Sequence, residues 1–448
     1  MSPWNSNRVS PAQIIIIGFI LLILAGTLLL MLPLSSRSGQ ITPFGDALFT
    51  ATSATCVTGL VINDTYTYWS PFGQLVILLL IQAGGMGVVT LTVAVSIIMG
   101  KRIGLKQRFV MQEAISAPHM GGIVRMTGFI IRVTLITEGV GALLLALRFC
   151  PQLGLWRGLW YAVFHSVSAF CNAGFDLMGR DAPFSSLTAF SSDPVVLLTV
   201  AALIVMGGIG FFAWDDVKQH RLHLRAYRLQ TKLVLTVTAA LLILPALYFF
   251  FYEFNLPQWQ GMPLDERVLS SVFQSVTPRT AGFNSVDLTL LSAPAILLTI
   301  ALMLVGGSSG STAGGFKTTS LAMLFLSIRA VLRRKDSIQI FQRRIPPDVL
   351  RSTVAIVMLY LLLFLSGSFL LCCFEGVSMS AAMFECASAV GTVGLSLGIT
   401  PELGVASRLI LIALMIFGRV GGLTMLYAIS GGHAPAPSQL PQEKIAVG

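Results

Sequence analysis

The sequence predicts an all-α polytopic membrane protein with eight transmembrane helices and four re-entrant half-helices, arranged as four helix–re-entrant loop–helix repeats in a pseudo-fourfold ring. Three observations predict this fold. Of 448 residues, 55% are hydrophobic and only 11% are charged, whereas a soluble domain carries about 25% charged residues. Long and short apolar segments alternate along the chain, and one local sequence recurs at the end of each short segment. Most of the surface must therefore face a lipid bilayer.

Eight long apolar segments account for the membrane crossings. A helix needs about 20 apolar residues to cross the hydrocarbon core of a bilayer. The long segments span 12–32, 72–99, 126–149, 194–212, 231–251, 294–326, 352–374 and 406–429. Taken in consecutive pairs, they predict four repeats at 12–100, 126–213, 231–326 and 352–430, and the second helix of the third repeat is interrupted.

A shorter apolar segment lies between the two members of each pair. These segments span 44–52, 159–170, 268–276 and 379–390. About ten residues cannot cross a bilayer but suit a re-entrant half-helix. The end of a half-helix exposes backbone groups, which are tolerated at membrane depth only beside protein or a water-filled cavity. Four such ends predict a shared hydrated cavity, in which the carboxyl ends of the helices favour a cation.

The distribution of charge predicts the orientation. The formal net charge is +10, and the basic residues gather in three linkers at 101–125, 214–230 and 327–351. The positive-inside rule places these linkers, both termini and the short polar tail 431–448 in the cytoplasm, so the re-entrant loops enter from outside. Because the cations lie in short loops rather than on the face of a soluble domain, no nucleic-acid partner is expected.

The ends of the four short segments align without a gap. They read Ser53-Ala-Thr-Cys-Val-Thr-Gly59-Leu60, Ser168-Ala-Phe-Cys-Asn-Ala-Gly174-Phe175, Val276-Thr-Pro-Arg-Thr-Ala-Gly282-Phe283 and Ser388-Ala-Val-Gly-Thr-Val-Gly394-Leu395. The glycines recur about every 110 residues, which indicates an internal repeat. Rings of main-chain carbonyls can replace the hydration shell of K⁺, and strands that aim carbonyls inward favour glycine. We therefore predict a short selectivity filter; the alternative is four ordinary loop glycines.

These stretches resemble the Ktr/Trk/HKT superfamily of potassium transporters, specifically the membrane subunit of bacterial Ktr systems. The matching residues are 52–60, 165–176, 275–284 and 387–396, and 306–318 and 417–421 also fit. The resemblance implies K⁺ uptake across the bacterial inner (plasma) membrane through a channel-like pore, with no enzymatic activity and no organic cofactor. It further implies Na⁺ stimulation at an unknown site, a homodimer, and a separate cytosolic ring of nucleotide-binding RCK-fold regulatory subunits.

The resemblance also assigns the filter residues, which are the three residues before each repeat glycine and the glycine itself. They are Cys56, Val57, Thr58, Gly59, Cys171, Asn172, Ala173, Gly174, Arg279, Thr280, Ala281, Gly282, Gly391, Thr392, Val393 and Gly394. A serine replaces the first filter glycine in some plant relatives that pass Na⁺, so Gly59 favours K⁺. We expect the Arg279 side chain to pair with a carboxylate behind the filter; the alternative is an electrostatic tuner of the filter.

A segment of small residues interrupts the apolar run 294–326. It consists of Gly306, Gly307, Ser308, Ser309, Gly310, Ser311, Thr312, Ala313, Gly314 and Gly315, and Lys317 follows closely. This composition cannot hold a stable helix in lipid, so it must line the cavity. The resemblance implies an intramembrane loop that obstructs the pore beneath the filter. We expect Arg419, a charge inside the last span, to hold this gate closed by hydrogen bonds; alternatively it reaches the cytoplasmic interface.

Two other functions deserve comparison with a pore. An alternating-access carrier is usually built on inverted repeats, whereas these four repeats share one orientation. An intramembrane serine hydrolase would use Ser308 or Ser309, but it needs a base, and His165 is the only histidine among the predicted spans and re-entrant loops. In the third span, we expect Arg132 and Glu138 to form a buried pair.

Overall fold

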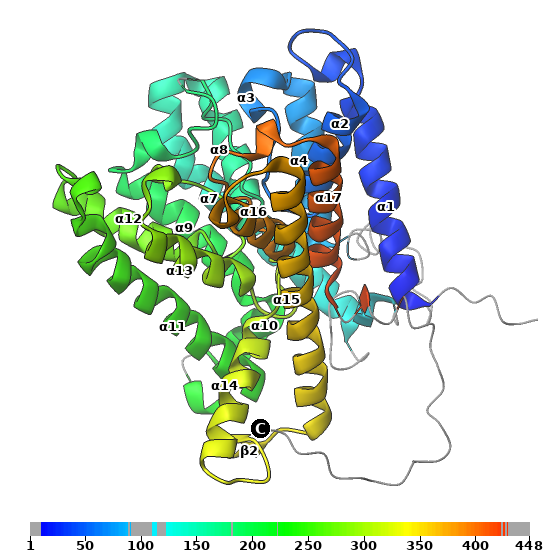
Figure 1. Ribbon diagram of the computed structural model, residues 1–448, viewed down its shortest axis with the longest axis vertical. Helices are drawn as coiled ribbons and strands as arrows, with labels where there is room; N and C mark the ends of the chain where they lie inside the picture. Colours follow the sequence, from blue (N-terminus) through cyan, green and yellow to red (C-terminus); the bar gives the residue numbers. More distant parts are fainter. Residues whose placement is uncertain are drawn as a thin grey trace, which may run out of the picture.

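The computed structural model describes residues 10–87, 90, 110–113, 122–180, 182–221, 223–422, 424–425 and 428. These residues are mainly helical and include one short antiparallel hairpin, formed by β1 (Gln339–Ile340) and β2 (Arg343–Arg344). The helices follow one another as four copies of a long helix, a half-helix and a second helix (Figure 1). The all-α membrane architecture predicted from the sequence is confirmed.

The first helix of each repeat is the longest. These helices are α1 (Pro11–Leu30), α7 (Ile123–Leu153), α11 (Leu229–Phe251) and α15 (Pro347–Glu375). Each is long and apolar enough to cross a membrane. Large apolar side chains on their outer faces are more than half exposed, among them Leu21, Leu143, Leu244 and Phe369. An exposed apolar surface of this kind on helices long enough to cross a bilayer indicates contact with lipid.

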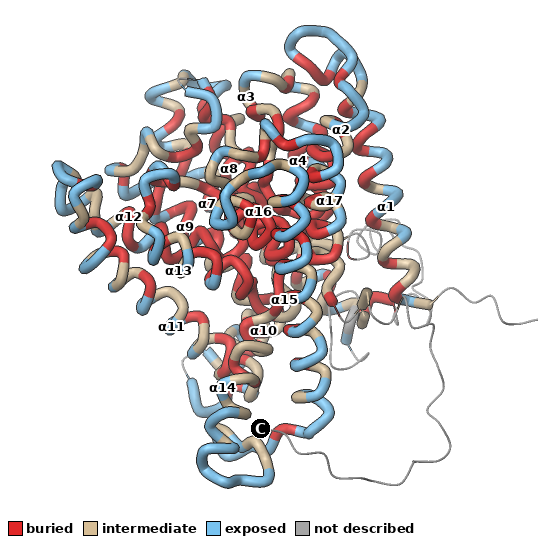
Figure 2. Tube along the Cα trace, in the orientation of Figure 1, coloured by how far each residue is buried: buried red, intermediate tan, exposed pale blue. Residues whose placement is uncertain are grey.

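The half-helices lie inside this outer layer. They are α2 (Phe44–Thr55), α8 (Leu155–Phe170), α12 (Leu264–Val276) and α16 (Met379–Gly391). Phe49, Phe164 and Phe384 occupy the same position in three of them, ten residues before the repeat glycine, and all three are fully buried. Buried residues gather around α16 at the centre of Figure 2. The carboxyl ends of the half-helices are therefore held by a packed core.

The second helix of each repeat is short and ends at a break. These helices are α4 (Pro71–Met86), α9 (Pro194–Ile209), α13 (Ala293–Leu304) and α17 (Val405–Val420). Gly87, Gly210 and Gly421 follow three of them with φ values of 84°, 95° and 92°, which glycine adopts without steric cost and which cannot continue an α-helix. The predicted spans 194–212 and 406–429 are therefore not continuous helices.

Two further helices continue the chain after these breaks. α10 (Phe211–His220) follows Gly210 and is bent by 92° from α9. α14 (Thr318–Leu332) follows the small-residue loop that the sequence predicted within the third repeat. Within the described residues, four helices can cross a membrane by their own length, and the bent pair would make a fifth.

The remaining elements are short and lie between the helices of the repeats. They are α3 (Thr65–Tyr68) and 3-10 turns at Pro33–Ser35, Thr188–Phe190, Leu224–Ala226, Glu253–Asn255, Pro257–Trp259, Leu288–Leu290 and Thr400–Glu402. Most of the predicted linker 101–125 and the whole tail 431–448 lie outside the described residues.

Candidate functional site

The four repeat glycines form a closed ring. A Cβ atom added to any of them would lie within 3.0 Å of the carbonyl oxygen that precedes the glycine of another repeat. These pairs are Gly59 with Ala173, Gly174 with Ala281, Gly282 with Val393, and Gly394 with Thr58. The contacts run from the first repeat through the fourth and return to the first. The glycines therefore surround a common axis that leaves no room for side chains.

The backbone around this ring has the same unusual conformation in every repeat. The residue two positions before each glycine is left-handed, with φ values of 57° at Val57, 60° at Asn172, 66° at Thr280 and 51° at Thr392. A positive φ is a genuine outlier for β-branched residues such as valine and threonine. These residues end the half-helices, because a left-handed residue terminates an α-helix; the amides of Val57, Asn172 and Thr392 still donate to carbonyls in the last turn of the half-helix.

Hydroxyl groups at the ends of the half-helices brace the ring. The Gly59 amide donates to Ser53 Oγ (3.1 Å) and the Gly394 amide to Ser388 Oγ (2.9 Å). Ser168 Oγ donates to the Phe175 carbonyl and Thr277 Oγ1 to the Phe283 carbonyl, both at 2.6 Å. Sequence reasoning missed these braces, although a serine stands six residues before the glycine in three of the aligned stretches.

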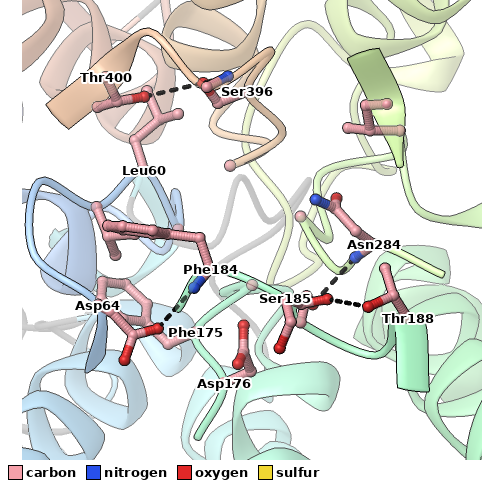
Figure 3. A pocket seen from close by; sticks show the side chains of 18 of the residues that line it. Leu60, Asp64, Phe175, Asp176, Phe184, Ser185, Thr188, Asn284, Ser396 and Thr400 are labelled. Carbon is pink, nitrogen blue, oxygen red and sulfur yellow. Dashed lines mark hydrogen bonds between the residues drawn. The ribbon is translucent and has the colours of Figure 1, made fainter. Parts of the chain in front are cut away.

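A cavity of about 460 Å³ opens onto one side of the ring and is lined by all four glycines. We call it the vestibule. Asp176, Asn284 and Ser396, each two residues after a repeat glycine, also line it (Figure 3). Asp64 accepts a hydrogen bond from the Phe184 amide of the next repeat (3.0 Å). Burial and the neighbouring Asp64 raise the pKa of Asp176 to about 7.

The small-residue loop 306–317 packs against the ends of two half-helices, α8 and α16. The Ser308 amide donates to the Gly208 carbonyl (2.9 Å), and the Phe211 amide donates to the Gly310 carbonyl (2.8 Å). Thr312 Oγ1 donates to the carbonyl of Phe170, the last residue of α8 (3.0 Å). The loop is therefore fixed to the break between α9 and α10 and lies under the half-helix end of the second repeat.

Two cations contact this loop. Arg419 of α17 donates to the Thr312 carbonyl, and it also donates to the carbonyls of Gly84 and Gly85 on α4 (2.9 Å for Gly85). It therefore bridges the loop to the last turn of α4 in the first repeat. Lys317 Nζ donates to the Ala313 carbonyl (2.9 Å) within the loop.

Comparison with known proteins shows which family this chain matches. The family model TrkH, described as cation transport protein, matches residues 5–433.

The chain belongs to the TrkH family.

Curated relatives cover nearly the whole of this TrkH-family chain. The potassium/sodium uptake protein NtpJ of Enterococcus hirae is 38% identical, and the alignment covers 99% of this chain and 98% of that protein. Ktr system potassium uptake protein B of Bacillus subtilis is 40% identical over 94% of each chain. The crystal structure of the potassium transporter TrkH from Vibrio parahaemolyticus matches with a TM-score of 0.71 at 19% identity, covering 95% of this chain and 85% of that chain. This last match shows a shared fold.

The TrkH-family chain is a membrane transporter and not an enzyme, and its serine and histidine side chains agree with this. Ser308 Oγ lies 2.8 Å from Thr318 Oγ1. His165 Nε2 accepts from the Leu177 amide (3.3 Å), and Nδ1 lies 2.8 Å from the Tyr161 carbonyl, to which it donates in the tautomer that this requires. The side chains of Ser308 and His165 thus both form hydrogen bonds within the fold.

His165 has a counterpart two repeats away in the TrkH-family ring. Glu385 stands at the same register, nine residues before the repeat glycine, and is fully buried. It accepts from Ser396 Oγ (2.9 Å) and from Thr400 Oγ1. In the second and fourth repeats, an ionisable side chain thus ties the segment after the glycine to its half-helix. Sequence reasoning did not single out Glu385.

Two predicted ion pairs are wrong. The Arg279 side chain points away from the axis of the ring, and its Nη2 lies 3.5 Å from Thr238 Oγ1 on α11. In the described part of the chain, no carboxylate lies within 4.0 Å of Arg279. Glu138 accepts from Gln82 Nε2 (3.2 Å) instead of Arg132, which is exposed. Residues six apart point to different faces of a helix.

Main-chain oxygens, rather than clustered side chains, gather at the glycine ring of this TrkH-family chain. Within the described ranges, no group of three or more His, Cys, Asp or Glu side chains could bind a metal ion. The ring instead offers the Thr58, Ala173, Ala281 and Val393 carbonyls. Main-chain carbonyl oxygens suit an alkali cation because they can replace its hydration shell.

Proposed function

We propose that this protein carries K⁺ into the cell through a pore along the axis of the glycine ring. The closed ring of four glycines, with a left-handed residue before each, is the observation that carries the proposal. The filter comprises the sixteen residues assigned from the sequence, which supply the carbonyl oxygens. The carboxyl ends of the four half-helices add a field that favours a cation. The printed names of two curated relatives, a potassium/sodium uptake protein and a potassium uptake protein, support K⁺ as an ion that is carried.

The loop 306–317 acts as the gate in this proposal. It lies against half-helix ends on the side of the ring away from the vestibule, so an ion leaving the filter would meet it. Arg419 and Lys317 hold it in the closed position through carbonyl hydrogen bonds. K⁺ would pass when the loop leaves this position.

Regulation and assembly extend the proposal. The protein works in a bacterial inner membrane with both termini and the basic linkers in the cytoplasm. We infer a homodimer that is stimulated by Na⁺ and controlled by a separate cytosolic ring of nucleotide-binding subunits. The printed name of the Bacillus subtilis relative refers to a Ktr system, which supports a partner subunit. The printed name of the Enterococcus hirae relative, a potassium/sodium uptake protein, supports a role for Na⁺ in transport.

Ion flux into liposomes tests the pore. In Gly59→Ser, the new side chain meets the Ala173 carbonyl, and we expect most of the preference for K⁺ over Na⁺ to be lost. Gly39→Ser is the matched control, because Gly39 also has a positive φ (69°) but has no neighbour within 4 Å of an added Cβ. Unchanged selectivity in Gly59→Ser, with native-like protein recovery, would contradict the proposal.

A further inference from the structure

A second cavity lies at the end of the molecule far from the vestibule, between the start of α11 and the β1–β2 hairpin. Its volume is about 710 Å³. The hairpin marks the lower end of the molecule in Figure 1, opposite α3. Five cations line the cavity together with one exposed aromatic ring: Arg225, Arg228, Lys232, Arg343, Arg344 and Phe341. We call it the basic pocket, and no acidic residue is among those that line it.

The charges of the basic pocket are largely uncompensated. Arg228 Nε lies 4.0 Å from Asp216 Oδ1, and the two oxygens of that carboxylate already accept from His220 Nδ1 (3.0 Å) and from the Arg228 amide (2.9 Å). For the other four cations, no carboxylate lies within 4.0 Å among the described residues. Like charges in one cavity repel one another, so an anion there lowers the electrostatic free energy.

The pocket sits where a membrane helix begins. α11, which is long and apolar enough to cross a bilayer, starts at Leu229 on the pocket wall. Its N-cap residue Arg228 gives no side-chain cap, so the first amides of the helix remain available to an anion. An anion bound here would lie at the depth of lipid headgroups.

The neighbouring helix α14 carries an exposed apolar face. α14 packs against α11, and three of its side chains at helical spacing, Phe325, Ile328 and Leu332, are 65%, 57% and 79% exposed. Residues three and four apart lie on one face of a helix. A ligand with a negative head and apolar chains would therefore satisfy both surfaces.

We propose that the basic pocket binds the phosphate headgroup of an anionic phospholipid, with the acyl chains along the exposed face of α14. Arginine side chains from two walls can form charge-assisted hydrogen bonds to one phosphate. Basic pockets between membrane helices are suited to anionic headgroups. A lipid fits both surfaces better than a soluble anion, because a soluble anion would leave the apolar face of α14 uncovered.

Lipid retention by the purified full-length chain tests the site. Phosphatidylglycerol and phosphatidylcholine with identical acyl chains are titrated in detergent, and bound lipid is measured by native mass spectrometry. We expect selective retention of phosphatidylglycerol and about thirtyfold weaker binding in the double variant Arg343→Gln/Arg344→Gln. Arg333→Gln/Arg334→Gln removes the same charge from the same linker outside the pocket and should bind like the native chain. Arg225→Gln, on the opposite wall, should weaken binding independently.

Three outcomes would overturn the lipid site. The first is an equal loss in both double variants, which would indicate general surface charge. The second is competition by inorganic phosphate at the concentration of the lipid, which would assign the pocket to a soluble anion. The third is unchanged lipid retention in Arg343→Gln/Arg344→Gln together with loss of a co-purifying soluble subunit, which would assign the pocket to protein docking. None of these readouts depends on ion transport.

Discussion

At the scale of single residues, the conformation of the ring depends on side chains behind it. Val57, Thr280 and Thr392 hold positive φ values that cost about 1–3 kcal/mol each. Such residues persist only when their surroundings fix them. The hydroxyls of Ser53 and Ser388 supply part of that restraint, because they accept hydrogen bonds from the amides of the ring glycines.

Asp176 should give ion uptake a pH dependence. Because burial raises its pKa to about 7, this carboxyl is neutral below pH 7 and negative above it. We expect K⁺ flux at limiting K⁺ to rise as the external pH passes through about 7, since the ionised group attracts cations into the vestibule. In Asp176→Asn, this rise in K⁺ flux should be absent, and the flux should stay at the level that the native protein shows at low pH.

The control for this prediction is another carboxylate of the vestibule. Asp287→Asn also removes a negative charge that lines the cavity, and it should lower flux while keeping the rise with pH. Persistence of this rise in Asp176→Asn would show that a different group titrates. The same raised pKa means that folding stability falls as pH rises from about 4 to about 7, because the unfolded chain has already released this proton.

At the scale of elements, three of the second helices, α4, α9 and α17, pack closely on the end of the half-helix of their own repeat. An added Cβ on Gly84 would collide with the last carbonyl of α2, and one on Gly207 with the last carbonyl of α8. An added Cβ on Gly418 would collide with the Val390 carbonyl near the end of α16. This packing brings the breaks of the second helices next to the ring, where loop 306–317 and Arg419 meet them.

The closed position of the loop should depend on Arg419. Arg419→Gln removes a charged donor from the Thr312, Gly84 and Gly85 carbonyls. Hydrogen bonds to charged groups contribute about 1.5–3 kcal/mol, so we expect K⁺ flux in liposomes to rise by about tenfold or more. A shortened loop should have the same effect.

Arg351→Gln provides the control for charge removal, because Arg351 is exposed at the start of α15. Its flux should equal that of the native protein. If Arg419→Gln and the shortened loop both leave flux unchanged, the loop does not limit permeation.

The elements also show what the sequence could predict. The half-helices, the glycine register and the small-residue loop are local patterns that recur, so they were readable without the fold. Three other features could not be predicted from the sequence. They are the bend at Gly210, the Thr238 hydroxyl beside Arg279 and the Gln82 amide beside Glu138. In both side-chain cases the partner is more than forty residues away, and helix packing alone decides which residue it is.

At the scale of the whole molecule, the ring has a seam where the first and last repeats meet. Arg408 of α17 and Asp46 of α2 form an ion pair at 2.8 Å across it, and each side chain is 22% exposed. The other neighbouring repeats are joined through the chain itself. The seam therefore relies on side chains for closure.

Breaking this pair should loosen the assembled ring. We expect Asp46→Asn to lower the free energy of unfolding by about 1–2 kcal/mol, measured by thermal unfolding in detergent. A double-mutant cycle with Arg408→Gln isolates the pair, because its coupling energy is independent of other effects of each change. Additive single changes would show that the pair does not hold the seam.

Housing all four quadrants in one polypeptide has a further consequence. In a homotetramer, any substitution appears four times and must be tolerated everywhere at once. Here His165 and Glu385 occupy opposite quadrants, while Thr50 and Phe273 stand at the same register in the other two. Because each quadrant has its own residues, one quadrant can carry the loop 306–317 and another can carry Asp176, while all four keep the repeat glycine at the shared axis.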